Sequence, residues 1–212
     1  MAALSVPNPL YAIADTLSQP DVSFQTLTQQ LCAGGVRLLQ LRVKQHSIQD
    51  FLSLAKEVQQ ICQQHRCLLI INDRVDIARA IDADGVHVGQ GDMPLAAARK
   101  VLGREKISGA STHDPQQALA AAHAGADYIG FGPLFGTTTK ATGYTPRGLD
   151  QLRQVRRLVS LPIIAIGGIT PARAPSALEA GADAVAMISD IVLAPNIQHR
   201  VETILQRLKP YT

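Results

Sequence analysis

The sequence has little charge and few cysteines, and it lacks both long apolar runs and clusters of basic residues. Charged residues make up 17% of the 212 residues, and the net charge is only +3. A dispersed charge of this size argues against nucleic acid or a membrane surface as a partner. No apolar stretch approaches the length of a transmembrane helix, and no signal peptide is visible at the N-terminus. We therefore expect a soluble cytoplasmic protein.

Several sequence signatures of other protein classes are also missing. The three cysteines, Cys32, Cys62 and Cys67, are odd in number and lack metal-ligand spacing, which argues against a disulfide framework. We expect them to be small buried residues of a reducing compartment. There is no glycine fingerprint of a dinucleotide-binding fold. No acid at a suitable spacing marks Ser111 as a triad nucleophile, which argues against a hydrolase.

What the chain does contain is a regular alternation of apolar runs and helical segments. The apolar runs, which are nearly continuous, predict strands of a parallel sheet covered by helices. They span residues 10–15, 38–43, 68–71, 85–88, 106–110, 128–131, 162–166 and 184–188. Helices are predicted over residues 23–33, 47–65, 94–103, 149–159 and 171–181. Three further helices are defined at one end only: one begins at Pro115, and the other two end near residues 80 and 208. Eight such units predict a single (β/α)8 TIM barrel over residues 1–212, with an open doubly wound sheet as the alternative.

In such a barrel the functional site lies at the carboxyl ends of the strands, and the second strand ends in Gln40-Leu41-Arg42-Val43-Lys44. A period of two places Gln40, Arg42 and Lys44 on one face. This face would point into the barrel mouth, while Leu41 and Val43 pack on the helices. Two cations there indicate an anionic ligand, although an internal layer of salt bridges is the structural alternative.

Two carboxylates follow neighbouring strands. Asn72 and Asp73 close the third strand, and Asp92 lies in the loop after the fourth. Mg²⁺ is typically held by one or two carboxylates together with substrate phosphate oxygens. Each acid could instead cap a helix or form a turn. Together with Arg42 and Lys44, they predict a site for Mg²⁺ and a diphosphate.

The fifth strand is followed by Ser111, which could donate to a phosphate oxygen or cap the next helix. His113, close by, and His87 are more readily explained as packed, hydrogen-bonded side chains than as general bases.

A second region rich in hydrogen-bond donors follows strands six to eight. A long loop after residue 131 contains Thr137, Thr138, Thr139 and Lys140, which suit a phosphate. Strand seven ends in a glycine pair that includes Gly168, and strand eight ends in Ile188 and Ser189. Loops after strands seven and eight of such barrels often bind phosphate through backbone N–H groups. The sequence therefore predicts a diphosphate with Mg²⁺ on one side and a monophosphate on the other.

Seven motifs in order at the strand ends resemble those of the thiamine-phosphate synthase family. They are QLRVK at Gln40, INDR at Ile71, DGVHVGQGD at Asp84, GASTH at Gly109, FGPLFGTTTK at Phe131, AIGGI at Ala165 and MIS at Met187. The resemblance implies a TIM-barrel transferase that joins a hydroxymethylpyrimidine diphosphate to a thiazole phosphate, or to its carboxylated precursor, and releases pyrophosphate. It implies a dissociative reaction in which the pyrimidine stabilises a carbocation and the thiazole nitrogen attacks.

The resemblance also assigns roles to residues. The segment from Gln40 to Lys44 would bind the pyrimidine diphosphate together with Asn72, Ser111 and Lys140, and Asp73 and Asp92 would hold Mg²⁺. Residues Thr137 to Thr139, with Gly168, Ile188 and Ser189, would bind the thiazole phosphate. Arg42, Lys44, Lys140 and Ser111 would act on the leaving group. The partners would be these small molecules; the sequence leaves open whether the chain forms a homo-oligomer.

Three other functions compete with this interpretation. The related thiazole tautomerases share the barrel but typically have a histidine where this chain has Pro133. Another phosphate-binding barrel isomerase would need an acid–base pair rather than a set of ligands for Mg²⁺ and diphosphate. A non-catalytic regulator that binds thiamine precursors should have lost charged ligands, and none is visibly missing. Two departures from the family pattern are Val43, where an acid is common, and Gly136, where proline is frequent.

Overall fold

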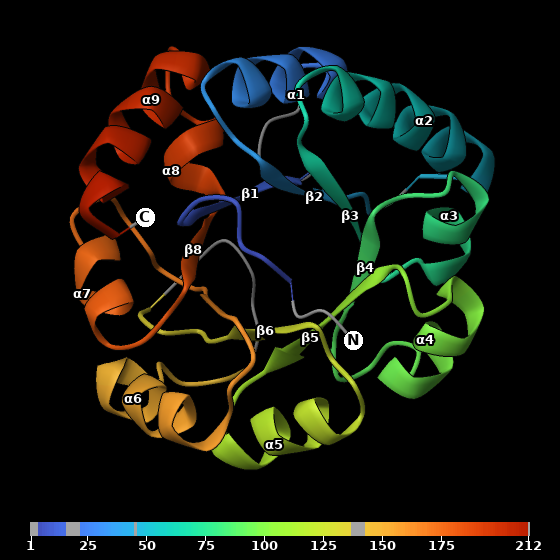
Figure 1. Ribbon diagram of the computed structural model, residues 1–212. Helices are drawn as coiled ribbons and strands as arrows, with labels where there is room; N and C mark the ends of the chain where they lie inside the picture. Colours follow the sequence, from blue (N-terminus) through green and yellow to red (C-terminus); the bar gives the residue numbers. More distant parts are fainter. Residues whose placement is uncertain (1–3, 16–21, 45, 137–142, 212) are drawn as a thin grey trace.

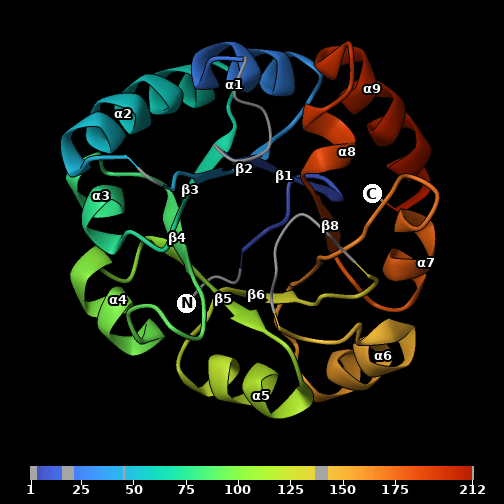
Figure 2. The same ribbon diagram turned by 180° about the vertical axis from the view of Figure 1, so that it is seen from behind.

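The computed structural model describes residues 4–15, 22–44, 46–136 and 143–211. Its eight parallel strands close into a barrel in chain order, from β1 through β8 and back to β1. Figure 1 looks along the barrel axis and shows the strands as an inner ring surrounded by helices, and Figure 2 shows the same arrangement from the opposite end. The predicted (β/α)8 barrel is therefore confirmed.

The strands begin and end close to the predicted positions. They are β1 (Leu10–Asp15), β2 (Leu38–Arg42), β3 (Leu68–Asn72), β4 (Gly85–Val88), β5 (Ile107–Thr112), β6 (Tyr128–Phe131), β7 (Ile163–Ala165) and β8 (Ala184–Met187).

The helices form the outer layer. They are α1 (Phe24–Ala33), α2 (Ile48–Gln64), α3 (Val75–Ala80), α4 (Leu95–Leu102), α5 (Pro115–His123), α6 (Gly148–Leu158), α7 (Ala174–Glu179), α8 (Ser189–Val192) and α9 (Ile197–Leu208), followed by a 3₁₀ turn (Lys209–Tyr211). None of the helices in these ranges is long and apolar enough to cross a bilayer.

One helix begins later than predicted, and one helix was not predicted. Helix α7 begins at Ala174 rather than at Pro171, because the carbonyl of Thr170 accepts from the N–H groups of Arg173 and Ala174 in a tight turn. Helix α8 follows β8 directly, where only one final helix was predicted. Its four residues are too few to show a helical period in the sequence.

Alternation along the strands separates two apolar regions. Leu39 and Leu41 of β2, with Val43 just beyond it, belong to the large core between barrel and helices. Leu38 belongs to a smaller cluster inside the barrel, together with Tyr11 of β1 and other inward-facing side chains. The predicted two faces of β2 are therefore confirmed.

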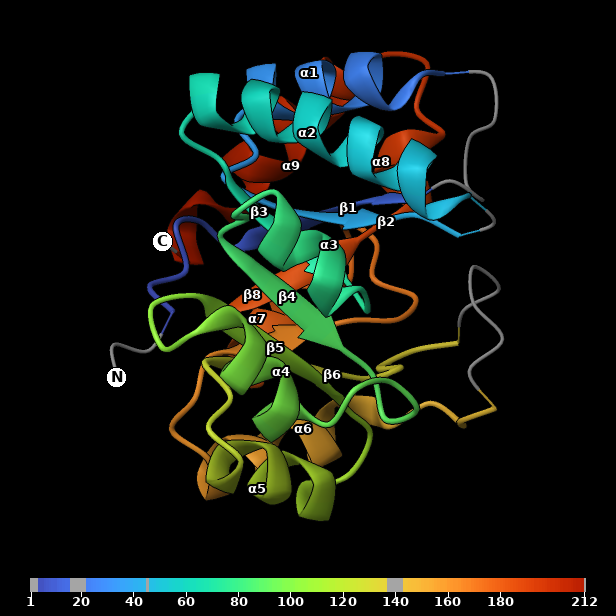
Figure 3. The ribbon, with the colours of Figure 1, turned by 90° about the vertical axis from the view of Figure 1, so that its right-hand side faces the viewer.

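The N-terminal segment closes one end of the barrel interior. Leu4 is only 7% exposed and packs in the interior cluster, and Val6 packs against that cluster. In Figure 3 this segment lies at the end from which the strands start, and in Figures 1 and 2 it crosses the ring of strands. The amino end is therefore filled with apolar side chains, which leaves the carboxyl end as the place for a site.

Candidate active site at the carboxyl ends of the strands

A cavity opens at the carboxyl ends of the strands. Its walls come from every strand of the barrel, or from the residues directly after it. Among the lining residues are the predicted site residues Gln40, Arg42, Asn72, Ser111, Gly168, Ile188 and Ser189. The structure thus brings seven of the predicted residues, far apart in the sequence, to one cavity.

A chain of hydrogen bonds crosses the floor of this cavity. Nε2 of Gln40 donates to the hydroxyl of Tyr11 at 3.0 Å, and that hydroxyl lies 2.9 Å from the hydroxyl of Tyr128. Nδ1 of His87 lies 3.0 Å from the Tyr128 hydroxyl, and its Nε2 lies 2.9 Å from Oγ of Ser111. Both histidine nitrogens thus have partners, and the Ser111 hydroxyl is fixed from below.

The two tyrosines in this series of hydrogen bonds, Tyr11 and Tyr128, are fully buried. Burial raises the pKa of both well above the ordinary value for tyrosine. Both hydroxyls therefore stay protonated over the physiological pH range. Neutral hydroxyls can both donate and accept. The series of hydrogen bonds can therefore run from the amide of Gln40 to the imidazole of His87 without an unpaired polar group.

The two predicted cations are both held by carboxylates. The guanidinium of Arg42 donates to Asp15 at the end of β1 over 2.5 Å, and Nζ of Lys44 donates to Asp73 over 2.6 Å. The sequence left two explanations open, an anionic ligand or internal salt bridges, and in the structure each cation has a carboxylate partner. The Arg42–Asp15 pair is almost buried, with side chains 13% and 3% exposed, because each charge compensates the other's loss of water.

Asp73 and Asp92 lie together, as the metal prediction requires. Asp73 has a φ of 62°, a left-handed conformation that turns the chain just after β3. Oδ2 of Asp92 accepts from the backbone N–H of Gly89 at 2.8 Å. Partial burial, and then a hydrogen bond with Asp73, raise the pKa of Asp92. Two adjacent carboxylates, one of them reluctant to ionise, fit a hard divalent cation, which would relieve their repulsion.

The glycine turn after β7 forms the opposite wall of the cavity. Gly167 and Gly168 both have positive φ, at 95° and 64°. A Cβ on Gly168 would lie 2.3 Å from the carbonyl oxygen of Gly136, so a side chain does not fit there. The turn is held from outside by Arg173, which donates to the carbonyl of Gly168 at 3.0 Å and lies over the ring of Phe135.

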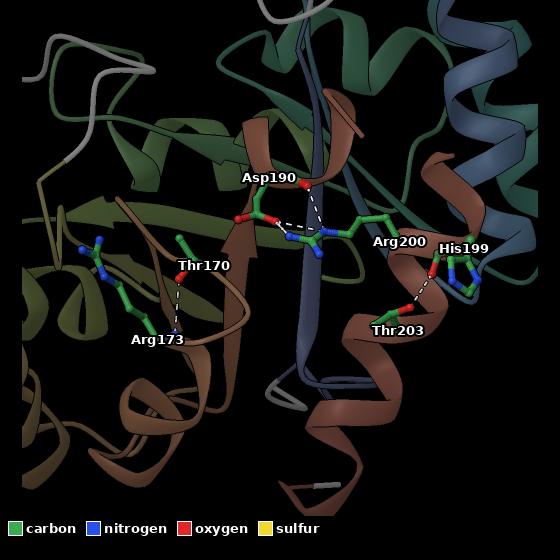
Figure 4. A network of polar contacts seen from close by, with 6 residues as sticks. All are labelled: Thr170, Arg173, Asp190, His199, Arg200 and Thr203. Carbon is green, nitrogen blue, oxygen red and sulfur yellow. Dashed lines mark hydrogen bonds and ion pairs between the residues drawn. The ribbon is translucent and has the colours of Figure 1, made fainter. Parts of the chain in front are cut away.

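The adjoining segment, Ile188 and Ser189, is anchored through α8. Asp190, the second residue of α8, accepts from Nε of Arg200 on α9 at 3.0 Å. Figure 4 shows this contact between α8 and α9, with the Thr170–Arg173 turn on a neighbouring segment. The glycine turn is therefore held by Arg173, and the segment of Ile188 and Ser189 by Arg200. Neither arginine lines the cavity itself.

Two aromatic rings meet beside the β5 and β6 ends. The ring of His113, which lines the cavity, stacks on Tyr144 with 3.8 Å between centroids. Nδ1 of His113 also lies 2.5 Å from the carbonyl oxygen of Gly132. The backbone N–H of Arg147 donates to the carbonyl of Pro133 at 2.8 Å. The segment from Gly143 to Gly148 thus packs back onto the end of β6.

Not every predicted residue has a side chain in the cavity. Leu41 and Val43 are buried against the helices, so any contact with a ligand is through their backbone. Thr137, Thr138, Thr139 and Lys140 lie outside the described residues. Sequence reasoning also missed Tyr11 and Asp15; the only available signal was that Asp15 ends an apolar strand.

Comparison with known proteins agrees with this geometry. The family model described as thiamine monophosphate synthase matches residues 10–191. A thiamine-phosphate synthase of Chloroflexus aurantiacus is 44% identical over 188 residues, which cover 89% of this chain and 87% of that protein. One from Halalkalibacterium halodurans is 42% identical over 201 residues, or 93% and 95% of the two chains.

Solved structures give the same result. The structure of a thiamine phosphate pyrophosphorylase from Pyrococcus furiosus superposes with a TM-score of 0.87 at 32% identity, covering 95% of this chain and 96% of that one. A geranylgeranylglyceryl phosphate synthase from Thermoplasma acidophilum, with a TM-score of 0.71 at 17% identity, shares the fold alone. The barrel, the cavity and the matched length together place this chain in the thiamine monophosphate synthase family.

Proposed function

We propose that the cavity joins 4-amino-2-methyl-5-hydroxymethylpyrimidine diphosphate to 4-methyl-5-(2-hydroxyethyl)thiazole phosphate, or its carboxylated precursor. The products are thiamine phosphate and pyrophosphate, so the activity is that of a thiamine-phosphate synthase, a transferase. The observation that carries the proposal is the division of the carboxyl end of the barrel. Arg42, Lys44, Asp73 and Asp92 gather on one side, and the glycine turn with Ser189 lies on the other.

Mg²⁺ fits the charged side. Asp73 and Asp92 would hold the ion, because they are adjacent carboxylates whose mutual repulsion a cation removes. When bound, the ion supplies positive charge to the oxygens of the leaving diphosphate. Lys44, already paired with Asp73, keeps the local charge balanced in the absence of the ion.

The protein's own groups bind the diphosphate and keep it in place. Arg42 and Lys44 supply donors and positive charge on the β2 side of the mouth, and Lys140, which lies outside the described residues, would supply a third charge. Ser111 donates a hydrogen bond whose direction is fixed by His87. Asn72, at the cavity wall, offers an amide to the pyrimidine or its diphosphate.

The reaction needs no nucleophile from the protein. The bond between the exocyclic carbon of the pyrimidine and the diphosphate oxygen breaks, and its electron pair leaves with pyrophosphate. The thiazole nitrogen then donates its lone pair to that carbon, forming the new C–N bond. The glycine turn with Ile188, Ser189 and the threonines 137–139 would hold the thiazole phosphate so that the nitrogen faces the carbon.

A coupled assay tests this function directly. The purified chain is mixed with both substrates, with and without Mg²⁺, and thiamine phosphate and pyrophosphate are followed together. We expect equal amounts of both products and no reaction in the presence of a chelator. Lys140→Ala should lower turnover, whereas Lys56→Ala, at an exposed position on α2, should not.

Two other outcomes would contradict the proposal. Binding of the thiazole phosphate with its isomerisation, but without coupling, would indicate a tautomerase. Binding of either substrate with no chemistry would indicate a regulator. A cytoplasmic location and the homo-oligomeric state stay predictions, to be checked by fractionation and by sedimentation.

A further inference from the structure

Three cysteines that are scattered in the sequence come together in the fold. Cys32 lies in the last turn of α1, Cys62 in the last turn of α2, and Cys67 directly before β3. Their sulfur atoms all lie within 4.8 Å of one another. The three side chains are buried, with exposed fractions of 1%, 1% and 4%. Since the chain contains three cysteines in total, every thiol of the protein is in this cluster.

The cluster is separate from the catalytic cavity. Cys67 precedes the first residue of β3, at the amino end of the barrel, whereas Asn72 at the other end of β3 lines the cavity. Five residues of strand at about 3.3 Å each separate the two places by about 16 Å. The sequence prediction of small buried cysteines is correct about burial, but the structure adds that the three sulfurs share one pocket.

Their spacing suits a single metal ion. Zinc–thiolate bonds of about 2.3 Å place the sulfurs of a tetrahedral site about 3.8 Å apart. The observed spacing, within 4.8 Å, needs a contraction of at most about 1 Å, which side-chain rotation can supply. A disulfide would use two of the sulfurs and leave the third without a role. Three thiolates converging on one point are typical of ligands for soft metal ions.

The surroundings also favour a cation. Cys32 and Cys62 lie at the carboxyl ends of α1 and α2, where the helix dipoles are negative. The carboxylate of Asp84 also acts on Cys62. Arg37 donates to the carbonyl of Cys32 at 3.1 Å, so one positive charge stands beside the cluster. A divalent ion with three thiolates carries one negative charge, which Arg37 would offset.

The three thiols are hydrogen-bonded to one another. Hydrogen bonds from the other two thiols lower the pKa of Cys32, and the hydrogen bond with Cys32 raises the pKa of Cys62 and of Cys67. Because all three side chains are buried, none has the accessible setting that a reactive free thiolate needs.

We propose that Cys32, Cys62 and Cys67 bind one thiophilic d10 cation of the zinc class, at a structural site distinct from that for Mg²⁺. On binding, the three S–H groups release their protons to solvent and three metal–sulfur bonds form, with no change of oxidation state. The ion would join the ends of α1 and α2 to the start of β3. It therefore stabilises this quarter of the barrel and takes no part in the coupling reaction.

Cadmium titration of the full, reduced chain tests the site. We expect one Cd²⁺ per chain, with thiolate-to-metal charge-transfer absorption in the ultraviolet and release of protons. Because all thiols of the protein are in the cluster, this absorption cannot come from elsewhere in the chain. Asp92→Asn should leave the absorption unchanged, which separates the cluster from the Mg²⁺ site. Absence of the absorption in the reduced wild type would overturn the proposal whatever the variants do.

Single substitutions complete the test. Cys32→Ala, Cys62→Ala and Cys67→Ala should each weaken Cd²⁺ binding at least tenfold, since a buried site with two thiolates is incomplete. Zn²⁺ should raise the melting temperature of the wild type but not of any variant that folds. Equal binding by these variants, or formation of a disulfide in place of metal binding, would contradict the site. Synthase activity at saturating Mg²⁺ should be the same with and without Zn²⁺.

Discussion

Nε2 of His87 lies 2.9 Å from Oγ of Ser111, and this contact connects the buried centre of the barrel to the substrate cavity. His87 is itself fixed by Tyr128 at 3.0 Å, so the serine hydroxyl has one defined direction. The sequence suggested that His87 is a packed, hydrogen-bonded residue, and this is what the structure shows. Its contribution to the site is to orient Ser111.

Removing the Ser111 hydroxyl tests this arrangement. Ser111→Ala should raise KM for the pyrimidine diphosphate about tenfold, the effect of one lost hydrogen bond of about 1.4 kcal/mol. The free energy of unfolding should change by less than about 1 kcal/mol. Steady-state kinetics and urea denaturation give both values, and Ser53→Ala, exposed on α2, serves as control. An unchanged KM would remove Ser111 from the binding site.

The structural role of Arg42 can be separated from the catalytic role proposed for it. Arg42→Met leaves Asp15 buried without this guanidinium and should cost about 3 kcal/mol of stability. Adding Asp15→Asn removes the buried charge and should restore most of that stability. Synthase activity should stay low in both variants, because the cation for the diphosphate is missing. Recovery of activity in the double variant would show that Arg42 serves only as a partner for Asp15.

Asp92→Asn should separate metal binding from folding. The substitution removes one of two adjacent carboxylates, so the apo protein should be as stable as the wild type or more stable. The Mg²⁺ concentration that gives half-maximal activity should rise at least tenfold, because a carboxylate ligand is lost. Asp150→Asn, at a side chain 99% exposed on α6, is the control. An unchanged Mg²⁺ requirement would contradict the metal assignment.

Gly168→Ala should weaken the binding proposed for the thiazole phosphate at the glycine turn. The new Cβ would meet the carbonyl of Gly136, and a φ of 64° is strained for alanine, so the loss of stability should be about 1–2 kcal/mol. KM for the thiazole phosphate should rise more than KM for the pyrimidine diphosphate. Gly103→Ala has a similarly positive φ, 92°, but open space around it. It should lose stability without the change in KM; equal effects in both variants would exclude a role of Gly168 in binding.

The buried tyrosines predict a characteristic response to alkali. Burial raises the pKa of Tyr11 and Tyr128 in the folded state, whereas in the unfolded chain both ionise near pH 10. The folded state binds these protons more tightly. Stability is therefore full below about pH 10 and falls above it, by about 1.4 kcal/mol per pH unit for each tyrosine.

Urea denaturation between pH 9 and about pH 11.5 measures this slope. Tyr11→Phe removes one of the two groups, so its slope should be smaller by about 1.4 kcal/mol per pH unit. The comparison cancels the effect of lysines, which titrate in the same range. Identical slopes for the variant and the wild type would show that Tyr11 ionises within the folded protein.

The sequence predicted the barrel and part of the cavity lining because these depend on local patterns. The alternation along β2 places Gln40 and Arg42 inside and Leu41 outside, and only a period of two is needed to see it. Strand ends could be located from apolar runs, and the polar residues Gln40, Arg42, Asn72 and Ser111 at those ends line the cavity. The carboxyl ends of the strands meet at one end of a (β/α)8 barrel, so these residues could be expected to lie close together without any knowledge of distances.

What the sequence could not supply is which residues become neighbours across the fold. Asp15 pairs with Arg42, 27 positions away, and no local pattern indicates that pairing. The same holds for the three cysteines, because metal motifs are recognised by short spacings, and here Cys32 comes from a different helix. Helix α8 was missed for another reason, since one turn has no measurable period.

The apolar plug formed by Leu4 and its neighbours at the amino end of the barrel has a consequence for kinetics. With that end filled, molecules enter and leave through the same mouth at the carboxyl ends of the strands. Two substrates and two products would therefore share one entrance. A shared entrance of this kind predicts an ordered addition of the substrates, in which the last product to leave competes with the first substrate to arrive.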